Sequence, residues 1–395
     1  MHAAGLGHIL HDGPLDDDRP AGMPRDVIGR LDEQADDARP DGAQTDDADA
    51  DRCGQDRNDS RKAEGTSDGT ERSSHLEARP AFFGGGSIVP VVSAVAGGIP
   101  IVAAIGECLA ANRIESIRGI LNGTSNFILT RMEEDGADYA EVLKLAQAKG
   151  FAEADPSMDV DGTDATQKLA ILAHLAFGVW VPWAEIPRTG IDGLDLDLLK
   201  YAGELGYRIR LVAVASRSDG RLAMRVAPAL VKIGTPLAET RGAYNAVSIV
   251  GDAVGRMFFH GLGAGQMPPA SAVVADIIDT VVGRAAITFR TTGVLESDTP
   301  AAKISDTSAQ ERHFLRIRVK DQPGVLAKIT GTLGEHGISI ASVIQHDVPG
   351  SSDAGVPLVI MTHACGSAAV QKAVAAIDTC DVVRGRSVCL SVLEE

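Results

Sequence analysis

Asp164 and Lys168 are a candidate acid–base pair. They stand four positions apart in a segment predicted to be helical, so they share one helix face. That face continues through Ile171, Leu172 and Leu175, which places the lysine where the helix enters the apolar core. On the pattern alone, a structural ion pair is the favoured interpretation, because such pairs are common. The alternative is a lysine at a buried edge, held by its aspartate, that transfers a proton in a reaction.

The loop before this helix is rich in carboxylates: Glu153, Asp155, Asp159, Asp161 and Asp164. Composition leaves three interpretations open, namely a solvated acidic loop, a calcium site, or carboxylates that hold the ammonium group of an amino-acid substrate. The glycine that follows Asp161 comes too early for an EF-hand, and no terminal glutamate follows, which counts against calcium.

Two further segments place glycines next to predicted helices. Asn122-Gly-Thr-Ser-Asn126 follows a strand pattern, and backbone N–H groups at the start of the next helix could hold an anion there. An ordinary helix cap by Thr124 or Ser125 is the favoured interpretation of that segment. Gly261-x-Gly263-Ala-Gly265 resembles a phosphate-cradling turn, although small residues there also allow close packing.

Hydrophobic periodicity places these candidates in a domain of strands and helices that we expect to span residues 87–290. Strands are predicted at residues 114–121, 208–215, 223–231 and 246–250. Helices are predicted at residues 125–134, 138–149, 164–177, 199–205 and 270–282. Asp138-x-x-Glu141 is interpreted as a capping box for the second of these helices, and Gly150 as its end.

A second, smaller domain is expected at residues 312–395, after a polar linker at residues 291–311. Strand patterns at 313–319, 339–345, 357–362 and 382–393 alternate with helix patterns at 324–336 and 367–377. The order βαββαβ is typical of a ferredoxin-like domain. The predicted fold class is therefore α+β, with a mixed sheet covered by helices followed by a ferredoxin-like domain.

Composition restricts the remaining function classes. The formal net charge of -17 counts against nucleic-acid binding, because such a chain does not neutralise a phosphate backbone. Residues 1–86, with no aromatic residue before Phe82, are predicted to be a disordered acidic segment. The five cysteines form no CxxC pair, which is typical of the reducing cytoplasm. The uncharged residues 87–106 are interrupted by glycines and prolines, so we expect no contact with a membrane.

Taken together and in order, these segments resemble the homoserine dehydrogenase family. The similar motifs lie at residues 95–101 (VAGGIPI), 119–129 (GILNGTSNFIL), 150–156 (GFAEADP), 161–172 (DGTDATQKLAIL) and 263–273 (GAGQMPPASAV). The C-terminal module resembles an ACT domain, with Asp321-Gln-Pro-Gly-Val-Leu as its ligand-loop signature. The resemblance implies NAD(P)-dependent interconversion of L-homoserine and L-aspartate 4-semialdehyde, on the route to threonine and methionine.

The resemblance also implies roles for individual side chains. It makes Lys168 the general acid and base at the reacting oxygen of the substrate. It makes Glu153 and Asp164 the residues that hold the amine and the hydroxyl of homoserine. Asp159 and Thr124 are expected to support the same substrate site.

Cofactors and partners follow from the same resemblance. Gly150 and Gly265 fall where the backbone of the family approaches NAD(P). A sodium ion is expected at the backbone carbonyls of Val92, Val95, Gly97 and Ile99. The sequence departs from the family pattern here, because Val-Ser-Ala-Val stands at residues 92–95 where the family has Glu-Ala-Ser-Val. An amino-acid effector such as threonine is expected at the ACT domain, and assembly as a homodimer or homotetramer is expected.

The Rossmann domain with which the family begins has no recognisable counterpart in residues 1–86. Gly5-Leu-Gly7-His-Ile-Leu10 lacks the third glycine of a dinucleotide motif and a preceding strand. We therefore expect little turnover from the chain as written, because nothing recognisable holds the nicotinamide, and we hypothesise a reading-frame shift near residues 80–92. A non-catalytic, amino-acid-binding oligomerisation protein is the alternative to the dehydrogenase.

Overall fold

The computed structural model describes residues 95–218, 221–284, 310–346 and 355–394, and every structural statement below concerns these residues. The predicted acidic segment at residues 1–86 lies outside them, as does nearly all of the predicted linker at residues 291–311. Val92, one of the expected sodium ligands, also lies outside the described residues.

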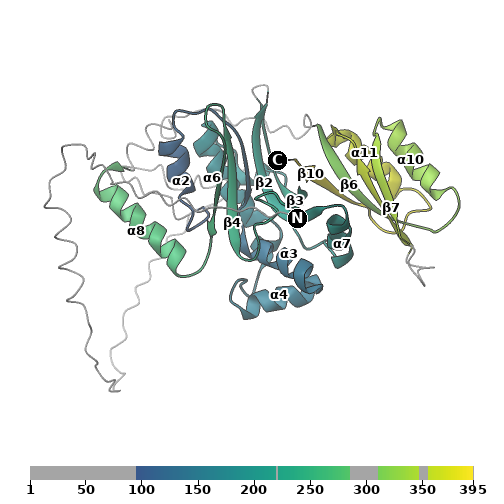
Figure 1. The fold of residues 1–395 in the computed structure, drawn as a ribbon, viewed down its shortest axis with the longest axis horizontal. Coiled ribbons are helices and arrows are strands. Elements are labelled where there is room, and N and C mark those ends of the chain that lie inside the picture. The colour runs from purple at the N-terminus through teal and green to yellow at the C-terminus, as the bar shows by residue number, and fades with distance from the viewer. Residues whose placement is uncertain (1–94, 219–220, 285–309, 347–354, 395) are drawn as a thin grey trace, which may run out of the picture. The chain divides into compact units, whose positions relative to one another are not determined.

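The first domain is built on an antiparallel sheet with the strand order β5-β4-β1-β2-β3 (Figure 1). The strand bounds are Ile114–Ile120 for β1, Tyr207–Ser218 for β2, Arg221–Lys232 for β3, Tyr244–Gly251 for β4 and Gly255–Leu262 for β5. β2 and β3 pair along their whole length as a hairpin. β1 lies between β2 and β4, so the chain that leaves its end starts from the middle of the sheet.

Helices cover this sheet and carry the acidic loop. Their bounds are Ile101–Ala103 for α2, the π-helical turn Ala104–Cys108 for η3, Gly123–Asp135 for α3, Tyr139–Ala148 for α4, Ser157–Val160 for α5, Thr163–Phe177 for α6, the 3-10 turn Trp183–Glu185 for η4, Leu196–Glu204 for α7 and Met267–Val281 for α8. α6 buries Leu169 and Leu172 completely in the main core. Gly178 ends α6 with a φ of +68°, a left-handed conformation that glycine adopts without strain.

The second domain has its own core and the predicted βαββαβ order. Its elements are β6 Gln310–Val319, α10 Val325–Glu335, β7 Ile340–Gln345, β8 Val356–Thr362, the short β9 Cys365–Gly366, α11 Ser367–Asp378 and β10 Val388–Leu393. The strand order β10-β6-β8-β7 is antiparallel throughout. Ile329, Leu333 and Ile377 are fully buried between this sheet and its two helices. The ferredoxin-like prediction is confirmed.

The two sheets are joined into one by strand pairing between distant parts of the chain. β10 pairs in parallel with β3 through Ser391 and Ala229, Val392 and Leu230, and Leu393 and Val231. The predicted mixed sheet is therefore formed by the two domains together, because the strands of the first domain alone pair antiparallel.

Three local predictions were wrong or incomplete. β5 was not expected, because Gly255, His260 and Gly261 weaken its strand pattern. The acidic loop contains the short helix α5, which was not expected either. Asp138 is the N-cap of α4 as predicted, but its side chain makes no cap hydrogen bond, so the expected capping box does not form.

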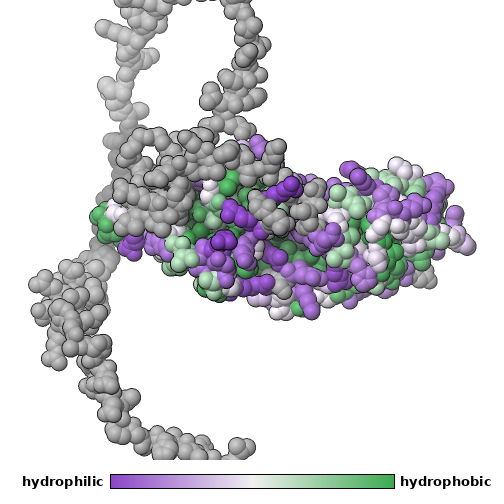
Figure 2. Space-filling model, turned by 90° about the horizontal axis from the view of Figure 1, so that it is seen from above, coloured by the Kyte–Doolittle hydropathy of each residue, from purple (hydrophilic) through white to green (hydrophobic). Residues whose placement is uncertain are grey.

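Figure 2 shows one face of the described residues. Hydrophilic and hydrophobic residues are interspersed where grey atoms do not cover this face (Figure 2). α8 exposes several large apolar side chains, among them Met267 and Val281. Even so, neither α8 nor any other helix of the described residues combines the length and hydropathy needed to cross a membrane.

Candidate active site

Lys168 and Asp164 form an ion pair on α6 at the edge of the core. Lys168 Nζ lies 2.7 Å from Asp164 Oδ2 and donates a second hydrogen bond, of 3.1 Å, to the carbonyl of Leu121. The two side chains are 22% and 26% exposed, so both lie in a partly enclosed position that a small molecule could still reach. The predicted i,i+4 pair is therefore present, and it extends to the end of β1.

Asn122 connects this pair to a second carboxylate. Its Nδ2 group donates to Asp159 Oδ1 at 2.7 Å and to Asp164 Oδ2 at 2.9 Å. Its Oδ1 atom accepts from the backbone N–H of Ser125 at 2.7 Å, so Asn122 is the N-cap of α3. The predicted cap by Thr124 or Ser125 was therefore wrong, because the asparagine one turn earlier takes that position.

Asp159 sits on α5 in an environment that disfavours its charge. Burial of the carboxyl raises its pKa above the ordinary value, and the negative charge of Asp164 raises the pKa further. The hydrogen bond from Asn122, the charge of Lys168 and the hydroxyl of Thr124 act in the opposite direction and lower the pKa. A buried carboxylate of this kind gains most from a cationic partner, such as the ammonium group of an amino acid. Asp159, Asp164 and Lys168 are thus brought together as the sequence predicted.

The other predicted substrate ligands stand at the edge of this cluster. Thr124 Oγ1 donates to the carbonyl of Phe151 at 2.7 Å, which ties the start of α3 to the acidic loop. Glu153 is exposed, and the structure shows no polar partner for its carboxylate among the described residues. Its backbone carbonyl accepts from Gln147 Nε2 at 3.1 Å. Among the described residues, the structure therefore shows no contact that joins Glu153 to the other carboxylates.

The remaining acids of the loop accept hydrogen bonds from the first residues of the helices that follow them. Asp155 accepts from the backbone N–H of Ser157 at 3.1 Å, and hydrogen bonds from Ser157 hold the pKa of its carboxyl below the ordinary value. Asp161 accepts from the backbone N–H and the hydroxyl of Thr163, at 2.7 and 2.9 Å. Within the described ranges, no group of three or more His, Cys, Asp or Glu side chains is arranged to hold a metal ion. The calcium interpretation of this loop thus gains no support.

The predicted cofactor and sodium segments pack against each other. Gly97 has a φ of +45°, and a Cβ atom there would lie 2.4 Å from the carbonyl oxygen of Gly263. Gly263 in turn leaves no room for a Cβ atom, which would lie 2.0 Å from Asn245 Nδ2. Gly150 and Gly265 have φ values of +71° and +109°. Both turns therefore present bare backbone, as close approach of a ligand requires.

Asn245 is a second asparagine near the lysine, and no sequence pattern indicated it. Its side chain is 1% exposed, and its Nδ2 group donates to the carbonyl of Leu121 at 3.3 Å. The same carbonyl accepts from Lys168. Asn245 thus connects the glycine turn at Gly263 to the backbone that holds the lysine, and nothing local in its sequence indicates this.

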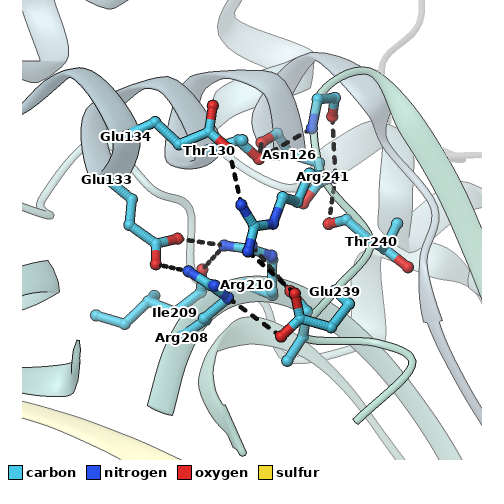
Figure 3. Close-up of polar contacts among 12 residues, drawn as sticks. Asn126, Thr130, Glu133, Glu134, Arg208, Ile209, Arg210, Glu239, Thr240 and Arg241 are labelled. Atoms are coloured by element: carbon cyan, nitrogen blue, oxygen red, sulfur yellow. Dashed lines mark hydrogen bonds and ion pairs between the residues drawn. The ribbon is translucent and has the colours of Figure 1, made fainter. Parts of the chain in front are cut away.

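A buried ionic network holds α3, and with it Asn122, against the sheet (Figure 3). Glu133 pairs with Arg208 and, at 3.4 Å, with Arg210, whose side chain is only 1% exposed. Arg210 also donates to the carbonyls of Ile209 and Ala238, at 2.9 and 3.0 Å. These contacts fix the helix relative to β2 and to the loop before β4.

A cleft of about 220 Å³ lies elsewhere, where β3 meets the second domain. Its charged lining residues are Arg188, Arg225 and Glu311. Arg225 Nη2 donates to both carboxylate oxygens of Glu311, at 2.7 and 2.8 Å, which neutralises this part of the wall. None of the predicted site residues lines this cleft, so the candidate active site is the cluster around Lys168.

Comparison with known proteins shows which families the two domains resemble. The family model for homoserine dehydrogenase matches residues 100–278, and the ACT domain model matches residues 313–380. The homoserine dehydrogenase of Pseudomonas aeruginosa is 41% identical over 315 residues, which cover 78% of this chain and 71% of that protein. The homoserine dehydrogenase of Neisseria gonorrhoeae is 43% identical over 311 residues, which cover 75% of this chain and 68% of that protein.

A solved structure shows the same relationship in three dimensions. The crystal structure of a homoserine dehydrogenase from Thiobacillus denitrificans matches with a TM-score of 0.69 at 40% identity. The match covers 76% of this chain and 69% of that chain.

Fold and site together define an oxidoreductase of an NAD(P)-dependent class that carries a C-terminal ACT domain. The chain belongs to the homoserine dehydrogenase family. This favours the dehydrogenase over the alternative of a non-catalytic amino-acid-binding protein.

Proposed function

We propose that the cluster of Lys168, Asp164 and Asp159 binds L-homoserine and transfers the proton of its reaction. The observation that carries the proposal is the continuous set of hydrogen bonds from Lys168 through Asp164 and Asn122 to Asp159. Two carboxylates suit the ammonium group of an amino acid, and a lysine beside them suits an oxygen that changes its protonation.

In the reduction direction, the Lys168 ammonium donates a proton to the aldehyde oxygen of L-aspartate 4-semialdehyde as that oxygen becomes a hydroxyl. In the oxidation direction, the neutral amine takes the hydroxyl proton from L-homoserine. NAD(P) supplies or accepts the hydride when it is bound. The carboxylates of Asp159, Asp164 and Glu153 hold the substrate so that its reacting carbon keeps one orientation, with Thr124 supporting their positions.

Binding of L-homoserine tests this assignment without requiring turnover. Asp164→Asn keeps the size of the side chain and removes its charge, so loss of a charge-assisted hydrogen bond worth about 1.5–3 kcal/mol should weaken binding roughly 10- to 100-fold. Lys168→Ala should leave binding within a few-fold, while any turnover falls by about 10²–10⁴-fold. Lys144→Ala, an exposed lysine on α4, is the matched control and should change neither quantity.

Two ligand sites are proposed on backbone groups. For NAD(P), the bare turns at Gly150 and Gly265 are the proposed points of approach. For sodium, we propose the carbonyls of Val95, Gly97 and Ile99, together with Val92. The positive φ of Ala96, a non-glycine residue at +58°, supports a constrained turn there. The carbonyl of Ile99 accepts from the N–H of Ile101 at 2.7 Å and keeps a second lone pair for a cation.

The ACT domain is proposed to bind an amino-acid effector such as threonine. The support is its signature Asp321-Gln-Pro-Gly, which ends at Gly324, the N-cap of α10, with a φ of +86°. We also propose a homodimer or homotetramer as the working assembly, and the cytoplasm as its compartment, since Cys108, Cys365, Cys380 and Cys389 are all free.

A further inference from the structure

We propose that Asn122 is a positioning residue that holds the carboxylates of Asp159 and Asp164 at a fixed separation and orients them to receive the substrate ammonium group. The proposal rests on the proposed function of this cluster. It adds a role for a residue that touches neither the reacting oxygen nor the lysine.

The orientation of the Asn122 amide is set by its surroundings. Its Oδ1 atom accepts from the N–H of Ser125, and a flipped amide would place two donors against each other at that contact. Its Nδ2 group therefore faces Asp159 and Asp164, and its two protons serve the two carboxylates. The side chain is 4% exposed, so water does not replace these bonds readily.

The amide matters because two carboxylates close together repel each other. Asp159 is half-buried and faces the charges of Asp164 and Lys168 from α6, with Asn122 donating to it and Thr124 beside it at the start of α3. Without the amide protons, the pKa of Asp159 would rise further, because burial and the charge of Asp164 would act with less opposition. A protonated Asp159 attracts an ammonium group less strongly than a carboxylate does.

The capping role of Asn122 can be separated from its role toward the carboxylates. Serine is also a good N-cap, so Asn122→Ser keeps an acceptor for the N–H of Ser125 while it removes both amide protons. Asn112 provides a matched control, because its Oδ1 atom accepts from the backbone N–H of Val254 at 2.8 Å, away from the cluster. Asn112→Ser makes the same chemical change outside the site.

The test is a titration of the aspartate carboxyl carbons by ¹³C NMR on the full chain, without ligand, for the wild type and both variants. Asn122→Ser should shift the Asp159 midpoint to higher pH by roughly one unit, as the loss of one hydrogen bond to a charged group implies. Asn112→Ser should leave it unchanged. An unchanged midpoint in a folded Asn122→Ser protein, with folding checked by circular dichroism, would overturn the proposal.

Calorimetric titration with L-homoserine from pH 5 to 8 provides the second measurement. Asn122→Ser should bind more weakly than the wild type, and its loss of affinity on acidification should begin at higher pH. Equal affinities and equal pH profiles would also overturn the positioning role. If the wild type does not bind L-homoserine, the proposed function fails, while the NMR titration still decides the role of Asn122.

Discussion

The buried Arg210 makes the ionic network beneath α3 sensitive to loss of one carboxylate. Burial lowers the pKa of the Arg210 guanidinium, and Glu133 is the nearby charge that opposes this most. In Glu133→Gln, a neutral amide replaces the carboxylate that pairs with Arg208 and Arg210. The guanidinium of Arg210 then stays buried without a counter-charge at that position.

The expected loss in the free energy of unfolding depends on how exposed Glu133 is and on which partners Arg210 keeps. Removing one member of a buried ion pair typically costs about 3–5 kcal/mol. Glu133 is 22% exposed, and Arg210 keeps its bonds to the carbonyls of Ile209 and Ala238, so the lower part of that range applies. We expect Glu133→Gln to lower the free energy of unfolding by about 3 kcal/mol.

Urea denaturation followed by circular dichroism measures this change, with Glu134→Gln as the matched control. Glu134 is the next residue on α3, but it pairs with Arg131 and Arg241, and these side chains are all at least 36% exposed. Its substitution should cost less than about 0.5 kcal/mol. Equal losses in the free energy of unfolding for Glu133→Gln and Glu134→Gln would refute the reasoning, because only Glu133 has a buried arginine as its partner.

Two further predictions concern pH and thiol chemistry. Because burial raises the pKa of Asp159, the native state holds more protons than the unfolded chain between pH 3.8 and the raised value, and stability falls as pH rises through that window. Asp159→Asn should remove this fall and increase stability to urea at pH 7, whereas a variant that keeps the slope of the wild type would contradict the assignment. Burial raises the pKa of the Cys389 thiol to about 12, so it stays protonated, whereas Cys108 is exposed. Peptide mass spectrometry after treatment with iodoacetamide at pH 8 should find Cys108 modified in the native protein, and Cys389 modified only after denaturation.

Much of the fold was predictable because the signals are local. α6 was expected from its apolar face and the glycine after Phe177, and the structure bounds it at Thr163–Phe177. The pairing of β3 with β10 had no such signal, since Leu230 and Val392 come from different domains and meet only when both have folded. β5 was missed because its glycines are poor strand formers, and its place depends on β4 beside it.

Some contacts of the candidate site could be predicted from spacing along the chain, and others depend on the tertiary fold. The pairing of Asp164 with Lys168 could be predicted from four-residue spacing on a helix. The contacts of Asn122 could not, because its two acceptors come from α5 and α6, which only the tertiary fold brings to the end of β1. Local pattern also did not distinguish Asp155 and Asp161 from Asp159, although Asp155 and Asp161 only accept hydrogen bonds from Ser157 and Thr163 at the starts of helices.

Titration of the full chain with L-homoserine by isothermal calorimetry tests the central claim most directly. The wild type should bind one molecule per chain, and Asp164→Asn should bind roughly 10- to 100-fold more weakly, as loss of a charge-assisted hydrogen bond implies. Absence of binding by a folded wild-type chain would contradict the account, as would equal affinity of the wild type and Asp164→Asn.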